Sequence, residues 1–367
     1  MERTVTIGAA VGVPEAEFTS VGAVVVSGNR LIVGQPMERN LRLFATTGEF
    51  VRSLGGPGEG PGEFEAVGEI GLTNGMLWVW DGELNRLQYF DGDGDYRYVS
   101  GILIRGHPAI ASGNLYVTGV LADGSILARV ARESSTAAAD PRAARLLLLL
   151  DSKGILRDTA AVLHGLGPAS EISDGLQAGR RLYVVRPVFD RSLLDVWPDG
   201  SGFVVVHRES AKQRGPHTYR VIKFSAEADT AFALNYPYDP VPISDSWLSR
   251  EVRKMEDAVS DDDRNRGGIL ANRRRLRGAL REAFGRLNYF PAVVTVEAAA
   301  NGTTWLHLRT GPDSFVWQVL DDVGHPIGRF EEPPGGWLVA GDLNGAWFVE
   351  RDEFEVPYLV RYEFRDR

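Results

Sequence analysis

The sequence predicts an all-β protein, a six-bladed β-propeller made of four-stranded antiparallel blades. Alternating apolar segments and Gly-rich turns fill most of the chain, and Asn74–Tyr96 holds a turn, two strands and the start of a third. The same pattern occurs about 46 residues earlier, where Arg39–Phe44 matches Asn85–Phe90, and repeats of roughly 40–50 residues are typical of propeller blades. A strand at residues 3–8 has no hairpin partner nearby, so it can complete a last blade that shows only three strands.

Each blade is expected from its own run of strands and turn residues. The expected blades cover residues 21–54, 66–104, 109–162, 180–235, 292–331 and 336–366, with a loop around 164–179. Hairpin turns are expected at Asp123-Gly124, Asn301-Gly302 and Asn344-Gly345. Closure of the ring by the N-terminal strand would remove the open sheet edges that invite aggregation.

The pattern becomes helical between blades four and five. Apolar residues at the spacing of one helix face predict helices at about 245–258 and 268–285. We therefore expect one propeller domain over residues 1–367 with a helical insertion at 244–286. The insertion joins an outer strand to the next inner strand, which places it at the face where propeller ligands usually bind, and it could act there as a lid.

Composition and charge exclude several classes of protein. A net charge of −9 argues against nucleic acid as a partner, because nonspecific binding to phosphates needs a broad basic face. The absence of cysteine excludes disulfides and cysteine-ligated metals, and no apolar run is long enough to span a bilayer. We expect a monomer, periplasmic or extracellular after removal of an export signal, or otherwise cytoplasmic.

Two segments resemble a known family. Val79-Trp80-Asp81 followed by Asn85–Asp91 resembles the NHL repeat, and Gly58–Phe64 is similar to the GxGPGEF connection of bacterial NHL-like six-bladed propellers. The resemblance implies a six-bladed propeller that is often exported and mostly without assigned activity. Relatives by fold include calcium lactonases and esterases, strictosidine-synthase-like proteins and a zinc amidating lyase, alongside pure binding modules, so the fold alone does not decide the function.

Recurring arginines are the clearest functional signal. Asp123-Gly124 is followed eight residues later by Arg132, Asp199-Gly200 is followed equally by Arg208, and the comparable strand ends of blades five and six carry Arg309 and Arg351. Guanidinium groups at one depth in successive blades would suit a carboxylate, phosphate or sulfate, because arginine offers a planar pair of donors. The alternative is pairing of these arginines with glutamates of neighbouring blades.

Other charged residues accompany this predicted arginine ring. The Gly/Pro-rich connection Gly55–Phe64 carries glutamates that either form an acidic rim or belong to a rigid strap between blades. Arg273-Arg274-Arg275 either binds an acidic partner or forms a solvated helix face. The candidate ligand-binding residues are Glu63, Glu65, Arg105, Arg132, Arg208, Arg309 and Arg351.

Metal binding is a second hypothesis, with calcium or zinc as the candidate cofactor. None of the histidines forms a local HxH, HxxxH or HExxH pair, but propeller zinc sites draw single histidines from different blades. The histidines to inspect are His107, His207, His217 and His307, each of which can equally be structural. Calcium would need carboxylates at the starts of inner strands, where Glu65, Glu69 and Asp195 lie nearest.

Two functions follow from these patterns. The first is a propeller that binds a small anionic ligand or a protein partner at the lidded mouth of its central channel. The second is a metal-dependent hydrolase or lyase of the lactonase, esterase or zinc-lyase kind, acting at the same face. The chain lacks GxSxG and phosphate-loop motifs, the asparagines typical of the lactonases and a clear His-Tyr-Arg set of the zinc lyase.

Overall fold

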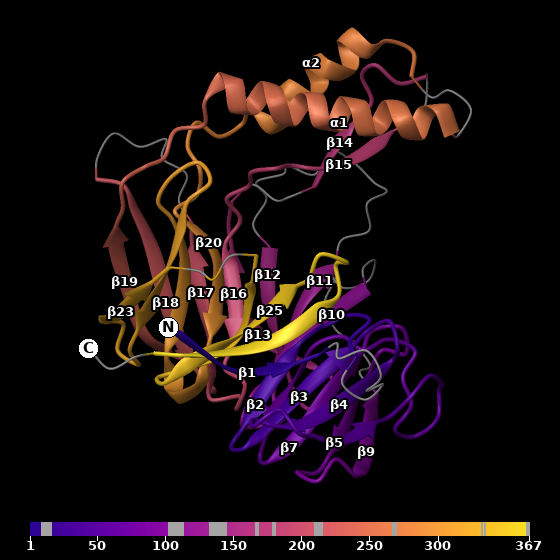
Figure 1. Ribbon diagram of the computed structural model, residues 1–367, viewed down its shortest axis with the longest axis vertical. Coiled ribbons are helices and arrows are strands. Elements are labelled where there is room, and N and C mark those ends of the chain that lie inside the picture. The colour runs from indigo at the N-terminus through magenta and orange to yellow at the C-terminus, as the bar shows by residue number, and fades with distance from the viewer. Residues whose placement is uncertain are drawn as a thin grey trace.

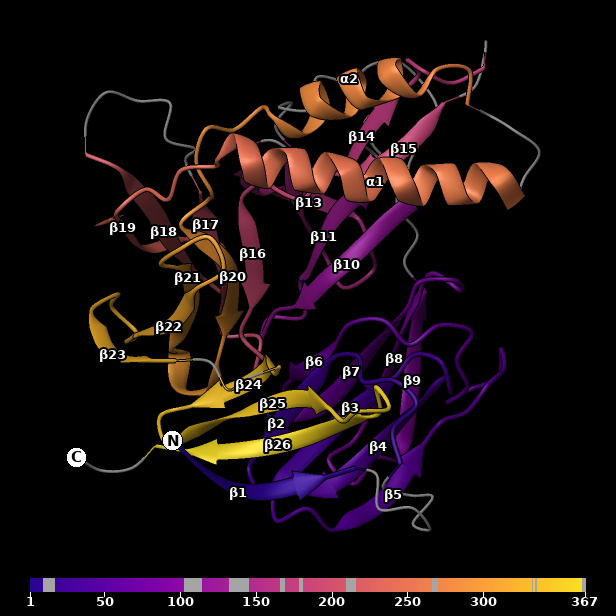
Figure 2. The ribbon, with the colours of Figure 1, turned by 45° about the horizontal axis from the view of Figure 1, so that its top comes forward.

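Six four-stranded antiparallel sheets form a ring (Figures 1 and 2). This computed structural model describes residues 1–8, 17–101, 114–131, 145–165, 169–177, 181–208, 216–265, 270–331, 333 and 335–364. The innermost strands contact one another in the closed order β2, β6, β10, β16, β20, β24 and back to β2. The predicted six-bladed propeller is confirmed.

The blades follow the chain in order. Blade one comprises β2 (Val24–Ser27), β3 (Arg30–Gln35), β4 (Asn40–Ala45) and β5 (Phe50–Leu54). Blade two comprises β6 (Ile70–Thr73), β7 (Met76–Asp81), β8 (Arg86–Phe90) and β9 (Tyr96–Gly101). Blade three comprises β10 (Asn114–Val120), β11 (Ile126–Ala131), β12 (Arg145–Leu150) and β13 (Leu156–Leu163).

The second half of the ring has the same design. Blade four comprises β16 (Leu193–Val196), β17 (Gly202–His207), β18 (Thr218–Ser225) and β19 (Thr230–Pro237). Blade five comprises β20 (Val293–Ala298), β21 (Thr304–Arg309), β22 (Phe315–Leu320) and β23 (Pro326–Phe330), with a 3₁₀ turn, η2 (Ala300–Gly302), between the first two. Blade six comprises β24 (Trp337–Asp342), β25 (Gly345–Arg351), β26 (Pro357–Glu363) and β1 (Glu2–Ile7).

The N-terminal strand closes the ring, as predicted. β1 pairs antiparallel with β26, from Glu2 opposite Glu363 to Ile7 opposite Leu359. Ile7 and Leu359 are both buried in one apolar cluster with residues of blade one. The first and last parts of the chain therefore share one sheet, which leaves β26 with a partner on each side.

Apolar clusters at the seams hold neighbouring blades together. Trp305 of blade five is fully buried and packs with Phe348 of blade six. Between blades one and two, Leu41 and Leu43 pack against Phe64 and Phe90. Alternation along each strand points one set of side chains toward each neighbouring blade, so both faces of a blade are covered.

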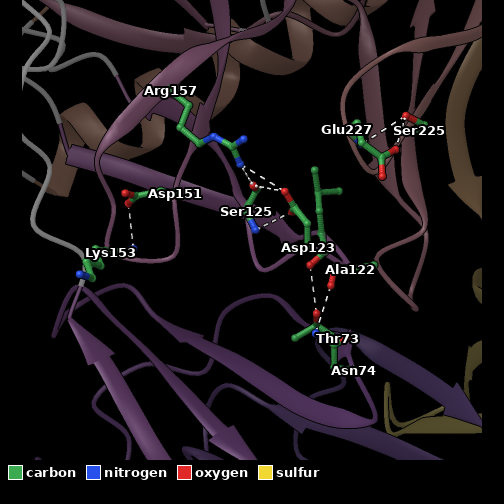
Figure 3. Close-up of polar contacts among 11 residues, drawn as sticks. Thr73, Asn74, Ala122, Asp123, Ser125, Asp151, Lys153, Arg157, Ser225 and Glu227 are labelled. Carbon is green, nitrogen blue, oxygen red and sulfur yellow. Dashed lines mark hydrogen bonds and ion pairs between the residues drawn. The ribbon is translucent and has the colours of Figure 1, made fainter.

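Polar contacts reinforce the seam between blades two and three (Figure 3), near the end of β10 that points away from the helices in Figure 2. Thr73 donates its hydroxyl hydrogen to the carbonyl of Leu121 at 3.0 Å, and the Asn74 side chain donates to the carbonyl of Ala122 at 3.1 Å. Within blade three, Arg157 donates to the Asp123 carboxylate at 3.2 Å. These bonds fix the short turns that end the inner strands of both blades.

A small module covers the other face of the ring (Figures 1 and 2). It consists of a two-stranded sheet, β14 (Ala169–Ile172) and β15 (Leu182–Val185), and the helices α1 (Asp245–Asn265) and α2 (Arg273–Phe284). We call these four elements the cap module. Its apolar core includes Ile172, Val184, Leu248, Leu276 and Phe284.

The cap module corrects two sequence predictions. Blade four was expected to begin at residue 180, but its inner strand β16 begins at Leu193, and β15 instead pairs with β14. The loop expected around 164–179 contains β14 and is therefore partly sheet. Strand β15 leaves the propeller because its buried Val184 packs against the helices rather than against a neighbouring blade.

The helices lie in the chain between β19 and β20, and their caps follow ordinary rules. The Ser244 hydroxyl accepts from the backbone N–H of Trp247 at the start of α1, and the Asn272 side chain accepts from Arg275 at the start of α2. Helix α1 extends to Asn265, beyond the predicted end at 258. In the described part of the chain, neither helix is long and apolar enough to cross a membrane.

Candidate functional site

Three carboxylates from different blades gather in the central channel. Glu69 lies directly before β6, Asp195 lies on β16 and Glu297 lies on β20. They line a cavity of about 220 Å³ together with residues of β2 and β24, so the inner strands of five blades contribute to its wall. We call these three residues the axial carboxylates.

Burial shifts the protonation of the axial carboxylates. Asp195 accepts a hydrogen bond from the backbone N–H of Ala298 at 2.6 Å, yet burial raises its pKa to about 7. The pKa of Glu297 is raised well above its ordinary value by burial, and then by the negative charges of Asp195 and Glu69. Burial and the neighbouring negative charges therefore both favour the protonated form of Glu297.

Tyr116 and Arg129 connect the axial carboxylates with the capped side of the ring. The Tyr116 hydroxyl donates to Glu69 at 3.1 Å, and the Arg129 guanidinium lies 5.2 Å from the centre of the Tyr116 ring. Burial raises the pKa of Glu69, while Tyr116 and Arg129 act in the opposite direction. The channel lining thus changes from a carboxylate, Glu69, to a guanidinium, Arg129, on either side of Tyr116.

The basic part centres on Arg191, in the segment that enters β16. Its side chain is half-buried, and no hydrogen bond or ion pair reaches its guanidinium within the described chain. Burial, followed by the positive charges of Arg145, Arg129 and Arg186, lowers the pKa of Arg191 to about 10. We call Arg129, Arg186, Arg191 and Arg208 the mouth arginines.

Arg186 ties this region to the cap module. Its Nε donates to the carbonyl of Ala283 on α2 at 3.1 Å, and the side chain is buried. Burial lowers the pKa of Arg186 to about 10, with a further contribution from Arg286. Helix α2 is therefore fixed to the segment that leads from β15 into blade four.

Arg208 is the one predicted ligand-binding arginine that joins the mouth arginines. Its Nε donates to the carbonyl of Arg191 at 2.8 Å and its Nη1 to that of Val293 at 3.2 Å, while Nη2 is buried without a partner among the described residues. Its guanidinium lies 5.0 Å from the ring centre of Phe189. Burial lowers the pKa of Arg208 to about 10, against the effect of Asp190.

The other predicted arginines have partners of their own. Arg309 is held between the rings of Phe290 and Phe315 and donates to the carbonyl of Pro312. Arg351 is exposed and pairs with Glu355 at 3.5 Å. Among the described residues, no hydrogen bond joins Arg208, Arg309 and Arg351 to one another. Arg105 and Arg132 lie outside the described residues.

The predicted glutamates have partners of their own. Glu63 accepts from the backbone N–H of Gly60 at 2.8 Å, within a connection whose carbonyls accept three hydrogen bonds from Arg86. Glu65 pairs with Arg39 at 3.0 Å. Gly62 has a φ of +79°, a conformation that favours glycine and that the tight connection requires.

The predicted histidines occupy different environments, and His107 lies outside the described residues. His207 forms a hydrogen bond with Ser192, His217 lies near the rings of Tyr238 and Tyr289, and His307 stacks on Trp317 with ring centres 4.7 Å apart. No group of three or more His, Asp or Glu side chains in the described chain has an arrangement that could hold a metal ion.

Sequence reasoning identified Glu69, Asp195 and Arg208 but missed Glu297 and Arg191. Glu297 lies on β20, where it continues an ordinary alternation in which Thr295 and Glu297 share one face and Val294, Val296 and Ala298 the other. It therefore looked like any polar residue of a half-buried strand, and only its place on an inner strand pointed to the channel or a seam. Arg191 carried no such signal, since it belongs to an irregular segment.

The fold and the channel define the class: a six-bladed β-propeller with a cap over one mouth. The DUF5128 family, described as a 6-bladed beta-propeller, matches residues 14–102. No curated protein sequence is significantly similar to the chain.

Several solved structures are similar to the chain. A candidate exported protein of Bacteroides fragilis NCTC 9343 is similar at 10% identity with a TM-score of 0.51, over 100% of this chain and 95% of that one. A member of the duf4221 family from Bacteroides vulgatus ATCC 8482 has 9% identity and a TM-score of 0.46, over 100% and 96%. A streptogramin B lyase has 9% identity and a TM-score of 0.40, over 97% and 96%. At such identities the likeness concerns the fold alone.

Proposed function

We propose that the chain is an NHL-like propeller that binds a small anionic ligand at the capped mouth of its channel. One observation carries the proposal: the half-buried Arg191 guanidinium has no hydrogen bond or ion pair within the described chain, although the positive charges of Arg145, Arg129 and Arg186 act on it. Gathering positive charges in a partly buried place is unfavourable unless an anion compensates them. A carboxylate, phosphate or sulfate would supply both the charge and the hydrogen-bond acceptors.

The axial carboxylates help to define where the ligand stops. An anion that enters from the capped side meets Arg191 and Arg129 first and then the carboxyl group of Glu69. Like charge opposes further movement into the channel, so the anionic group stays at the mouth arginines. The uncharged part of such a ligand can extend beneath the cap module.

Arg191→Gln tests the proposal because it removes the charge and keeps much of the volume. Phosphate, sulfate, acetate and citrate are titrated into the full chain by calorimetry at low salt. A charge-assisted hydrogen bond is worth about 1.5–3 kcal/mol, so we expect at least about tenfold weaker binding of the preferred anion. The affinity of the wild-type chain should also fall as salt is added.

Arg157→Gln is the matched control. Arg157 lies at the opposite face, where it pairs with Asp123 (Figure 3), so it should leave anion affinity unchanged. Equal affinities of the wild-type chain and Arg191→Gln would overturn the proposal, and so would an equal loss in both variants. A wild-type chain that binds none of the four anions but pulls down a defined acidic protein would favour the protein-partner alternative.

Acid–base chemistry in the channel is the second candidate function, in line with a metal-dependent hydrolase or lyase. It is supported by Asp195, whose raised pKa of about 7 suits a general acid or base, beside Glu297, whose pKa burial raises well above its ordinary value. A panel of lactones and esters, with calcium or zinc added, tests it. Turnover that disappears in Glu297→Gln supports it, whereas the absence of turnover, or full activity in that variant, excludes it.

A further inference from the structure

Two histidines meet at the seam between blades three and four. His164 directly follows β13, and His207 is the last residue of β17. Their ring centres are 5.5 Å apart and their planes are inclined by 50°. His164 is exposed and His207 is half-buried, so both can be reached from solvent. His207 was a candidate metal ligand from the sequence, whereas His164, which is far from it in the chain, was not.

Ser192 fixes the position of both histidines. Its N–H donates to the carbonyl of His164 at 2.8 Å, and its hydroxyl accepts from the N–H of His164 at 3.0 Å. The same hydroxyl donates to the carbonyl of His164 at 3.2 Å and lies 2.8 Å from Nδ1 of His207. One serine thus holds the backbone of the first histidine and the ring of the second.

The contact with Ser192 engages Nδ1 of His207, and either atom can be the donor because the roles depend on the tautomer. Nε2 of His207 is the ring nitrogen left for another partner. With the Ser192 hydroxyl hydrogen directed to the carbonyl of His164, Nδ1 carries the imidazole hydrogen and Nε2 has the lone pair with which histidine binds metals.

The spacing of the rings fits one shared metal ion. A zinc ion lies about 2.0–2.1 Å from an imidazole nitrogen, hence about 3.2 Å from the ring centre. Two ring centres 5.5 Å apart then correspond to an angle of about 120° at the metal, close to the tetrahedral value. His164 is exposed, so its ring can turn to complete the geometry at little cost.

We propose that His164 and His207 form a two-histidine site for a divalent transition-metal ion of the zinc, copper or nickel type. Imidazole nitrogen favours these ions, whereas calcium and magnesium prefer oxygen. Water completes the coordination, because the described residues supply no third side chain in a metal-binding arrangement. Burial lowers the pKa of His207, as do the positive charges of His164 and Arg220.

The test is a titration of the tag-free full chain with zinc by calorimetry, together with copper binding followed by electron paramagnetic resonance. We expect one zinc per chain and a copper spectrum with two coordinated nitrogens. His164→Ala and His207→Ala should each weaken zinc binding by more than about tenfold. His325→Ala is the control, because His325 is exposed beside Asp321 in the β22–β23 turn of blade five and should bind as the wild type does.

Ser192 provides the second readout, as a positioning residue. Ser192→Ala should weaken zinc binding by roughly tenfold, and Ser192→Thr, which keeps the hydroxyl, should restore it. Thermal unfolding without metal shows whether either variant still folds. His164→Ala keeps the test decisive in any case, since its exposed side chain contributes little to the core. Unsaturable zinc binding, or equal affinity in the wild type and His164→Ala, would refute the site.

Discussion

Replacing Asp195 by Asn should stabilise the protein at alkaline pH. Folding raises the pKa of Asp195 from 3.8 to about 7, a shift of about three units. Each unit corresponds to about 1.36 kcal/mol, so the ionised carboxylate costs at most about 4 kcal/mol above pH 7. Water can enter the channel, so we expect a gain of about 1–4 kcal/mol in the free energy of unfolding for Asp195→Asn at pH 8.5. The amide oxygen can still accept from Ala298.

The sign follows from proton binding. Between about pH 4 and pH 7 the folded chain holds a proton on Asp195 that the unfolded chain has lost. The free energy of unfolding of the wild type therefore falls as pH rises through this range. Asn does not titrate, so the difference between variant and wild type grows from pH 5 to pH 8.5.

Urea unfolding at pH 5 and pH 8.5 measures the effect. Asp321→Asn is the control with the opposite sign, because backbone N–H groups of His325 and Val323 hold the pKa of Asp321 below its ordinary value. That variant should lose stability at neutral pH and approach the wild type at acidic pH. A gain for Asp195→Asn that does not grow with pH would refute the electrostatic description of the channel.

Three further changes test the cap module and the closure of the ring. Gly175→Ala should lower the free energy of unfolding by about 1–3 kcal/mol, since φ is +83° and a Cβ would clash with the backbone nitrogen of Leu276. The same change should speed amide hydrogen exchange in α1 and α2, and unchanged exchange would contradict this. Glu256→Gln should cost about 1–3 kcal/mol at pH 7 in urea unfolding, because the carboxylate accepts from Arg277 at 2.6 Å. That cost should vanish well below pH 4.5, since the pKa of Glu256 is lowered in the fold. Deleting residues 2–7 should lower the melting temperature and cause aggregation, seen by light scattering, because β26 becomes an open edge.

The blades could be predicted because each carries its own local signals. Asp91 accepts from the backbone N–H groups of Asp93 and Asp95 in a turn. Asp and Gly are typical turn residues, so the sequence predicted this turn. The same turn recurs at Asp151 and Asp321 in other blades. Turn residues and apolar alternation are both patterns of a few consecutive residues. They can therefore be recognised in the sequence without knowledge of the fold.

Strand β15 shows where local signals fail. Leu182–Val185 has the composition of an inner strand and lies where blade four was expected to begin. Its partner is β14 rather than β17, and its buried Val184 packs on the cap helices. The surface that a short apolar strand covers depends on the elements near it in the folded chain. Its four residues alone do not predict those elements.

The predicted arginine ring and the observed mouth arginines differ for a related reason. An arginine at a strand end can reach the carbonyls and rings of the adjoining loop, and Arg309 and Arg351 are held in this way. Arg191 comes from the segment before an inner strand, and no such partner reaches its guanidinium within the described residues, so it is available to a ligand. A repeat pattern finds residues at equal depth in the blades. A binding group must also lack an internal partner, and only the packing of neighbouring segments decides that.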